Sequence, residues 1–281
     1  MKWLEKLDTI DPRWVYIIMA VSLVFPVLKP IGLAITIDET TTVPVFNWIE
    51  SLQPGDIVVG DVAFSGGSEG ELGPQLQSWF RHCMIKGVKV IMVAQWNTGE
   101  RLGYTLLEQV ANELEAEGIS AEYGVDWVYV GYKPGGTTLW RQMQLDFWGA
   151  CAETDMLGNS FQDLPLMHRF KKWDKESSKG IMAFVAGSPG LPTYTTYFPD
   201  YEIYVGNVAV QVPGAMNTLR AGQIKGLLAG LPGGAQYELL LNRPGRAVKL
   251  MDAQSMGHLW IMVLVVLGNI GFYMKSRARD E

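Results

Sequence analysis

Two long apolar stretches lie near opposite ends of this chain of 281 residues, and they constrain its architecture more than any other feature. The first covers residues 14–37, and the second runs through residues 259–274. A helix that crosses a bilayer needs roughly 20 mostly apolar residues, so the second helix must begin near Leu250. We therefore predict transmembrane helices at residues 14–37 and 251–274, joined by a folded domain over residues 38–250.

A cleaved signal peptide is the main alternative for the first stretch. Its apolar part is longer than the roughly 7–15 residues of a signal peptide core. The sequence Leu33-Ala34-Ile35-Thr36 is also a poor match to a cleavage site. Retention of the first stretch as an anchor is therefore favoured.

Polar residues interrupt both stretches, and each has two interpretations. Lys29 stands between two prolines in the first stretch, and Asn269 stands inside the second. Either residue could face a partner helix, with Asn269 forming a hydrogen bond across the helices. For Lys29 we favour an ammonium group that reaches the membrane interface.

Basic residues near the two stretches indicate the orientation of the chain. Those on the outer sides are Lys2, Lys6, Arg13, Lys275, Arg277 and Arg279. Downstream of the first apolar stretch no basic residue occurs before Arg81, although three basic residues lie shortly before the second stretch. Cytoplasmic flanks carry an excess of Lys and Arg. The pattern favours cytoplasmic segments at residues 1–13 and 275–281, in a two-pass protein of the cell membrane with an extracytoplasmic domain.

Apolar segments and amphipathic helices alternate between residues 44 and 212. Strands are predicted at residues 56–64, 88–94, 126–130, 180–186 and 207–212. Helices are predicted at residues 44–52, 72–84, 102–114, 139–152 and 194–198. Residues 160–179 are predicted to be an exposed loop or a crossover, and residues 215–242 to be helical in two pieces. Strands buried on both faces indicate the α/β class, here a three-layer Rossmann-like domain with a mostly parallel sheet.

Charge and cysteine content narrow the range of partners. The chain has 29 acidic and 23 basic residues and a net charge of −6, which predicts neither nucleic-acid binding nor a polybasic lipid-binding segment. Cys83 and Cys151 are interpreted as buried thiols rather than as a disulfide. Neither has metal-ligand spacing. We predict no metal, no cofactor and no nucleic-acid partner.

Known catalytic patterns find little support in the sequence. The three histidines, His82, His168 and His258, form no assignable set with a nucleophile and a carboxylate, and no G-x-S-x-G motif occurs. A carboxylate site built from Asp61 and Glu71 is conceivable. Acidic residues at strand and helix ends are nevertheless common without catalysis, so no catalytic residue is assigned.

The best candidate for a ligand site is the carboxyl edge of the predicted sheet, where ligands bind in open parallel sheets. Four loops leave this edge, at residues 65–71, 95–97, 131–137 and 188–190. The candidate ligand-binding residues in them are Ser65, Gly66, Gly67, Ser68, Gln95, Trp96, Lys133, Gly135, Gly136, Thr137 and Ser188. Each loop taken singly is also consistent with an ordinary turn.

The chemistry of these loops favours a small polar ligand over a phosphate. Glu69 and Glu71 would repel a phosphate, and the first loop lacks the Lys of a P-loop. Lys133 is the only cation in the four loops and would meet an anionic group. Trp96 could stack on a planar or apolar part of the ligand.

Two groups of residues resemble a family of prokaryotic membrane proteins. They are Tyr123-Gly-Val-Asp-Trp with Gly131-Tyr-Lys-Pro-Gly-Gly, and Met251-Asp-Ala-Gln-Ser with His258-Leu and Leu267-Gly-Asn-Ile. Members of that family have two terminal transmembrane helices, and no activity is established for them. The resemblance covers most of the chain. It implies the two-span architecture and implies no chemistry.

Three functional hypotheses follow from these observations. The first is a non-enzymatic accessory or assembly subunit that docks to a membrane protein partner or forms a homo-oligomer in the lipid bilayer. The second is a small-molecule-binding or sensing ectodomain that uses the strand-end loops. The third and least favoured is a hydrolase or transferase, because no catalytic set is recognised.

Overall fold

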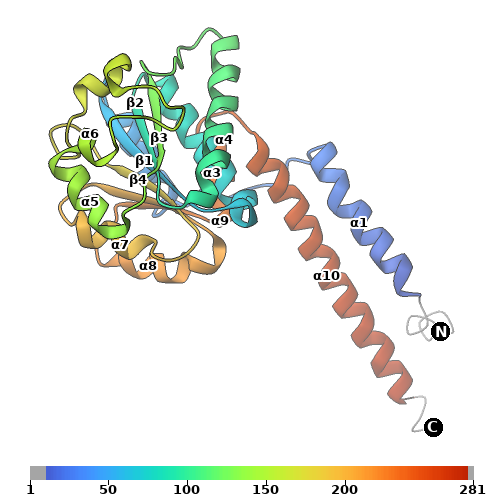
Figure 1. Cartoon of the computed structure of the whole chain (residues 1–281). Coiled ribbons are helices and arrows are strands. Elements are labelled where there is room, and N and C mark those ends of the chain that lie inside the picture. Colours follow the sequence, from blue (N-terminus) through green and yellow to red (C-terminus); the bar gives the residue numbers. More distant parts are fainter. Residues whose placement is uncertain (1–10, 278–281) are drawn as a thin grey trace. The chain divides into compact units, whose positions relative to one another are not determined.

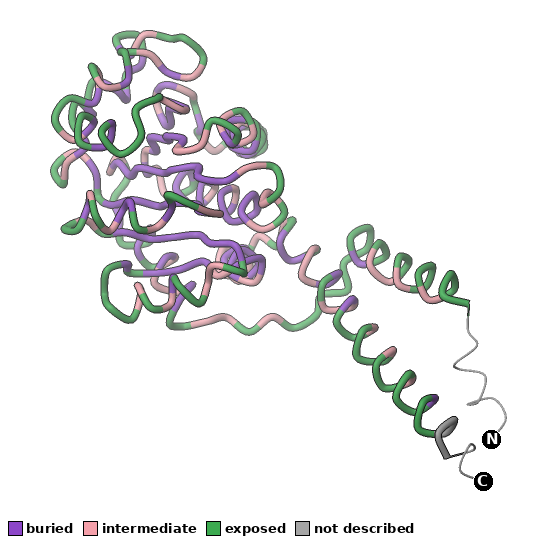
Figure 2. Tube along the Cα trace, turned by 60° about the horizontal axis from the view of Figure 1, so that its bottom comes forward, coloured by how far each residue is buried: buried purple, intermediate pink, exposed green. Residues whose placement is uncertain are grey.

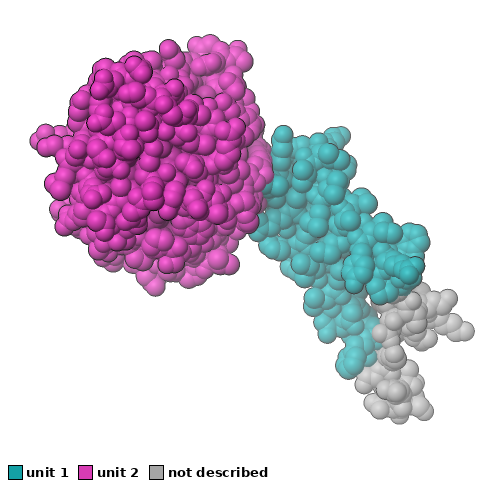
Figure 3. Space-filling view, viewed as in Figure 1, with its two compact units in different colours: residues 1–34, 248–281 teal, residues 35–247 magenta. Residues whose placement is uncertain are grey.

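The computed structural model describes residues 11–277, with side chains described as far as residue 273. Contacts divide it into two compact units (Figure 3). The larger unit covers residues 35–247 and holds the whole sheet. The smaller unit combines residues 1–34 with residues 248–281.

The larger unit is built on a sheet of six parallel strands in the order β3-β2-β1-β4-β5-β6 (Figure 1). The strands are β1 (Ile57–Ala63), β2 (Lys89–Ala94), β3 (Trp127–Tyr132), β4 (Ile181–Val185), β5 (Ile203–Asn207) and β6 (Gly226–Ala229). This order is that of Rossmann-type sheets, with the change of direction between β1 and β4. Nearly every strand residue is buried (Figure 2), as expected when helices cover both faces. The predicted α/β parallel fold is confirmed.

Helices cover both faces of the sheet and form two separate cores. One core contains apolar residues of α2 (Thr42–Ser51), α3 (Glu69–Ile85), α4 (Asn97–Ala116) and α9 (Gly230–Leu240). The other contains residues of α5 (Gly136–Leu145), α6 (Phe147–Ala150), α7 (Leu191–Tyr197) and α8 (Val212–Arg220). Short 3₁₀ turns are η2 (Gly66–Ser68), η3 (Phe161–Asp163), η4 (Pro165–Arg169) and η5 (Ala209–Gln211). Successive side chains of a strand point to opposite faces of the sheet, so alternate residues of each strand pack in the two cores.

The strand predicted at residues 207–212 is wrong. The fifth strand ends at Asn207, and the chain then forms η5 and the start of α8. Pro213 occupies the first turn of α8, where a residue without an N–H loses no intrahelical bond. The alternating pattern of these residues therefore reflects a loop and a helix start rather than a strand.

The region predicted as two helical pieces, residues 215–242, also contains a strand. It forms the end of α8, then β6, then α9. Pro232 lies in the first turn of α9, where proline is tolerated. A Cβ on Gly233 would lie 2.6 Å from the carbonyl carbon of Leu228, so glycine is needed for the helix to approach β6 this closely.

Two further predicted segments differ in detail. The helix predicted at residues 139–152 breaks at Asp146, whose carboxylate accepts a bond from the Gly149 amide and caps α6. Residues 160–179, predicted to be an exposed loop or a crossover, place several aromatic side chains in the core. The ring of Phe170 packs edge-on against Phe147 at 4.8 Å, and Trp173 is fully buried. Exposed lysines at residues 171, 172 and 175 lie beside these core residues in the sequence.

The smaller unit contains α1 (Pro12–Leu28) and most of α10 (Arg246–Arg277). Among the described residues, one helix is long and apolar enough to cross a membrane, over Arg246–Tyr273. The helix predicted over residues 14–37 ends at Leu28 and has 17 residues, so the structure does not support two spanning helices equally. Proline disfavours helical backbone in the residue before it, and Pro30 accounts for the extended Lys29.

Asp252 joins the two segments of this smaller unit. Its carboxylate accepts hydrogen bonds from the backbone amides of Ile31, Gly32 and Leu33 at 2.8, 2.9 and 2.9 Å. These amides follow α1 and have no helical partners, so the carboxylate satisfies three donors at once. Asn269, in contrast, donates to the Val265 carbonyl of its own helix, so the predicted bond across the helices is not observed.

Candidate functional site

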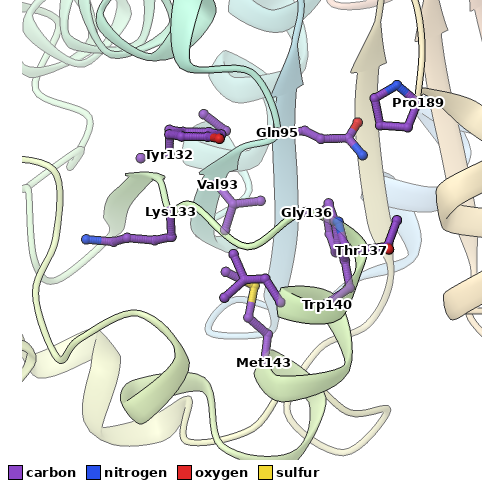
Figure 4. Close-up of a pocket in the computed structure, with 12 residues that line it drawn as sticks. Val93, Gln95, Tyr132, Lys133, Gly136, Thr137, Trp140, Met143 and Pro189 are labelled. Carbon is purple, nitrogen blue, oxygen red and sulfur yellow. The ribbon is translucent and has the colours of Figure 1, made fainter.

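A cavity of about 230 Å³ opens at the carboxyl edge of the sheet, beside the ends of β2 and β3 (Figure 4). Its lining residues are Val93, Ala94, Gln95, Gly131, Tyr132, Lys133, Gly136, Thr137, Leu139, Trp140, Met143 and Pro189. They come from the end of β2, the turn from β3 into α5, one face of α5, and the loop after β4. Most of them are apolar, which is typical of a small-molecule site.

Local backbone geometry forms the wall between β3 and α5. Gly131, Gly135 and Gly136 have φ values of 75°, 147° and 55°, which favour glycine. The amide of Tyr132 donates to the Glu100 carboxylate of α4 at 2.7 Å, which fixes the end of β3. The first turn of α5 then begins at the cavity rim and carries Thr137.

Gln95 provides the principal unsatisfied polar group of the cavity. Its side-chain oxygen and nitrogen are both shielded from solvent, and neither has a hydrogen-bond partner among the described residues. In Figure 4 this side chain extends from the end of β2 toward Pro189. Buried amide groups are normally hydrogen-bonded, so an orphaned donor and acceptor require an explanation.

Asp61 fixes the position of the Gln95 backbone. This residue lies on β1 and is fully buried, and its Oδ1 accepts a hydrogen bond from the Gln95 amide at 2.8 Å. Its Oδ2 accepts a hydrogen bond from the hydroxyl of Tyr194 on α7. Burial raises the pKa of Asp61 to about 8, although the backbone bonds from Gln95 and Val62 act in the opposite direction. The carboxyl is therefore protonated at neutral pH.

The ring of Tyr194 connects this buried acid to the cavity wall. It packs edge-on against Trp140, with ring centroids 5.5 Å apart, and Trp140 lines the cavity. Asp61 thus bonds the backbone of one lining residue and, through Tyr194, supports another. The arrangement positions the cavity and does not expose the acid to it directly.

The four predicted loops all leave the carboxyl edge of the sheet, but they do not contribute equally. Gln95, Lys133, Gly136 and Thr137 line the cavity. Gly135 precedes this part of α5, and Ser188 precedes the lining residue Pro189. The predicted residues Ser65, Gly66, Gly67 and Ser68 lead into α3 as η2 and lie outside the cavity lining.

Two predicted roles look different in the structure. The ammonium group of Lys133 points away from Gln95 and Gly136 in Figure 4, so its stem rather than its charge faces the site. The ring of Trp96 fills the space beside Gly187, where a Cβ would lie 2.7 Å from it. Trp96 therefore supports the loop after β4 and is not among the lining residues. Ligand binding by these residues stays a prediction.

The acidic residues of the first loop already have partners. Glu69 forms an ion pair with Arg246, and Glu71 accepts a bond from the Ala209 amide at 2.8 Å. Asp61 bonds Gln95 and Tyr194 instead, so the conceivable pair of Asp61 and Glu71 shares no partner.

His82 and the two cysteines are buried in the fold. His82 is buried between Glu50 and Tyr237, with 2.8 Å to each, and burial lowers its pKa. Cys83 and Cys151 are free and buried, as predicted. Among the described residues, no group of three or more His, Cys, Asp or Glu side chains gathers where it could hold a metal ion.

Side chains on α5 are the part of the site that the sequence did not reveal. Leu139, Trp140 and Met143 line the cavity, together with Val93 and Tyr132. Trp140 and Met143 lie in the helix predicted at residues 139–152, and helical spacing does not separate a core-facing residue from a cavity-facing one.

Comparison with known proteins found no match. No protein-family model, no curated protein and no solved structure matches this chain.

Proposed function

We propose that this protein is membrane-anchored and that its α/β domain binds a small molecule in the cavity beside β2 and β3. The observation that carries the proposal is the shielded, unpartnered amide of Gln95, a residue in the wall of a mostly apolar cavity. A pocket of this kind, with one orienting polar group, is a typical ligand site. The position at the carboxyl edge of a parallel sheet supports the same conclusion.

The membrane arrangement rests on the two apolar helices. α10 meets the length and composition of a spanning helix, and α1 is apolar at the lower limit of spanning length. Large apolar side chains on both helices are exposed, including Phe25 and Phe272. Together with the charge bias of the flanks, this supports a two-pass protein with an extracytoplasmic domain. Lys2, Lys6 and Arg279 contribute to that bias and lie outside the described residues.

An accessory or assembly role in a membrane complex is the second candidate function. It rests on the paired apolar helices, whose junction is fixed by Asp252. A protein anchored in this way could present its domain to a membrane partner or to a second copy. Gentle detergent extraction followed by native mass spectrometry tests it. A defined hetero-complex supports the accessory role, and a monomer argues against it.

Ligand binding is tested with a variant that blocks the cavity mouth. Thr137 lines the cavity and is exposed, while its exposed neighbour Thr138 is not among the lining residues. Purified full-length protein should gain thermal stability with a subset of small-molecule fragments. Thr137→Trp should remove that gain, and Thr138→Trp should retain it. Equal responses in both variants would place binding elsewhere and contradict the proposal.

Orientation is tested separately, in sealed inside-out and right-side-out vesicles. Added protease should digest the domain in right-side-out vesicles, where the outer face of the membrane is accessible, and should not digest it in inside-out vesicles. Digestion in inside-out vesicles alone contradicts the extracytoplasmic placement.

A further inference from the structure

The Gln95 amide has a chemical property that restricts what can occupy the cavity. Its carbonyl oxygen accepts hydrogen bonds, and its NH₂ group donates them. Both atoms lack partners among the described residues and are shielded from contact with a water-sized molecule, so a ligand in the cavity reaches them when the Gln95 side chain turns toward it. A ligand that satisfies both must present a donor and an acceptor side by side. An amide, lactam or carboxamide edge has this arrangement.

The remainder of the lining sets the shape of the ligand. Trp140, Met143, Leu139 and Val93 supply apolar surface. At about 230 Å³ the cavity is smaller than the roughly 300–1,000 Å³ of pockets for drug-sized ligands. This space fits a compound of one ring or two small fused rings.

The charge of the site disfavours an ionic ligand. Asp61 contacts the Gln95 backbone behind the wall, and the Lys133 ammonium points away from Gln95. No charged group among the described lining residues is therefore aimed at the amide end of the cavity. Transfer of an ion into such a site without a partner carries a large desolvation cost.

We infer that the cavity recognises a small, neutral, planar ring that carries an amide edge, with Gln95 pairing with that edge. The inference rests on the proposed ligand-binding function and specifies its ligand class. Asp61 acts as a positioning residue, because its bond to the Gln95 backbone fixes where the amide lies.

Two probes of similar shape separate amide recognition from simple apolar binding. Benzamide carries the donor and the acceptor, whereas acetophenone replaces the NH₂ group with a methyl group. Acetophenone is the more apolar of the two, so an apolar cavity alone would bind it more tightly. Binding is measured by ligand-observed NMR titration of the full-length protein in detergent micelles. Micelles without protein correct for partitioning.

The expected result is that wild-type protein binds benzamide about tenfold more tightly than acetophenone, as one or two extra hydrogen bonds predict. Gln95→Met keeps the length of the side chain and removes both polar groups. This variant should reverse the order of the two probes while retaining acetophenone binding. Retained acetophenone binding also shows that the variant is folded.

Three results overturn the inference, and they distinguish its failure from failure of the proposed function. If wild-type protein binds acetophenone as tightly as benzamide, and Thr137→Trp blocks both, the cavity binds ligands but Gln95 does not read an amide. If Gln95→Met leaves the preference for benzamide unchanged, another group provides it. If neither probe nor any fragment binds the wild-type cavity, the proposed function fails as well.

Discussion

Replacement of the buried acid, Asp61→Asn, should stabilise the protein at neutral and alkaline pH. The asparagine has the same shape, and its oxygen can still accept from the Gln95 amide. Its NH₂ group can donate to the hydroxyl oxygen of Tyr194, in place of the bond that Tyr194 donates to Oδ2. The substitution removes the ability to ionise and reverses the direction of this one hydrogen bond. Any change in the pH dependence of stability therefore reports the protonation of Asp61.

The sign follows from the raised pKa. In the folded protein the pKa of Asp61 is raised to about 8 from an ordinary value of 3.8, chiefly by burial. Between these values the folded state holds a proton that the unfolded state has lost. Stability therefore falls as pH rises through this window. The loss is absent below an unfolded pKa of 3.8 and complete above a folded pKa of about 8.

The magnitude follows from the width of the window. At about 1.4 kcal/mol per pH unit, the raised pKa of Asp61 lowers the free energy of unfolding by about 2 kcal/mol at pH 5 and by about 4 kcal/mol at pH 7. Asp61→Asn should remove this cost. Wild-type protein should thus lose roughly 3 kcal/mol more than the variant between pH 5 and pH 7. For a domain of this size the difference corresponds to roughly 6–12 °C in Tm.

Urea unfolding followed by tryptophan fluorescence, at several pH values from 5 to 8.5, measures the difference. Asp126→Asn is the matched control. Burial acts to raise the pKa of Asp126, but bonds from Lys89, Ser120 and the Glu122 amide outweigh burial and lower it. That control should therefore destabilise the protein at pH 7, opposite to Asp61→Asn. If Asp61→Asn has the same pH dependence as wild type, or is less stable at pH 8, the carboxyl is not held protonated and the reasoning is wrong.

Three further predictions concern packing and hydrogen bonding. Asp252→Ala should raise the hydrogen-exchange rates of the amides at residues 31–33 by about tenfold or more, whereas the exposed Gln254→Ala should leave them unchanged. Gly233→Ala should lower the free energy of unfolding by about 1–3 kcal/mol, because its Cβ would meet the β6 backbone. A Cβ at Gly214 would meet open space, so Gly214→Ala should raise the free energy of unfolding by about 0.5–1 kcal/mol. A change of the same sign in the two variants would refute the packing argument. Both cysteine thiols are buried, and burial raises their pKa values, so N-ethylmaleimide at pH 7 should label neither in folded protein and both after denaturation, as counted by intact mass.

The parts of the fold that could be predicted are those whose burial shows in the sequence as an apolar run or an apolar stripe. β1, β2 and β4 are almost entirely buried, and each is at least five residues long and mostly apolar. The helices between them show clear apolar stripes. The sheet order was not predictable in this way, because strand neighbours are chosen by tertiary packing rather than by local pattern.

The last two strands show why a local pattern fails. β5 and β6 are short, and each contains a glycine, which lacks a side chain that would mark a buried strand. Gly206 in β5 leaves room for the side chains of Gln75 and Phe184. In the segment after β5, residues alternate in the manner of a strand more regularly than in β5 itself, so the strand was predicted there. At the end of β5 the carbonyl of Asn207 accepts a hydrogen bond from the side chain of Gln75 on α3, which is distant in sequence.

The candidate site was predictable to the level of the sheet edge and no further. The rule that strand-end loops gather at one edge correctly indicated where Gln95 and Thr137 lie. It could not show that Gln95 would lack a partner, because satisfaction of a polar group depends on every neighbour in space. Nor could it show that the charge of Lys133 points away from the amide.

Asp61 links the stability of this domain to its candidate site. A buried, protonated acid costs the fold several kcal/mol at neutral pH, and an asparagine of the same shape would avoid that cost. The carboxyl bonds the backbone of Gln95 on one side and Tyr194 on the other, and Tyr194 supports Trp140 in the cavity wall. A cost in stability of this kind is expected where a residue serves a site. The same position therefore connects the two main experiments: Asp61→Asn should stabilise the fold, and any change in probe binding would measure how far the acid, rather than its shape alone, positions Gln95.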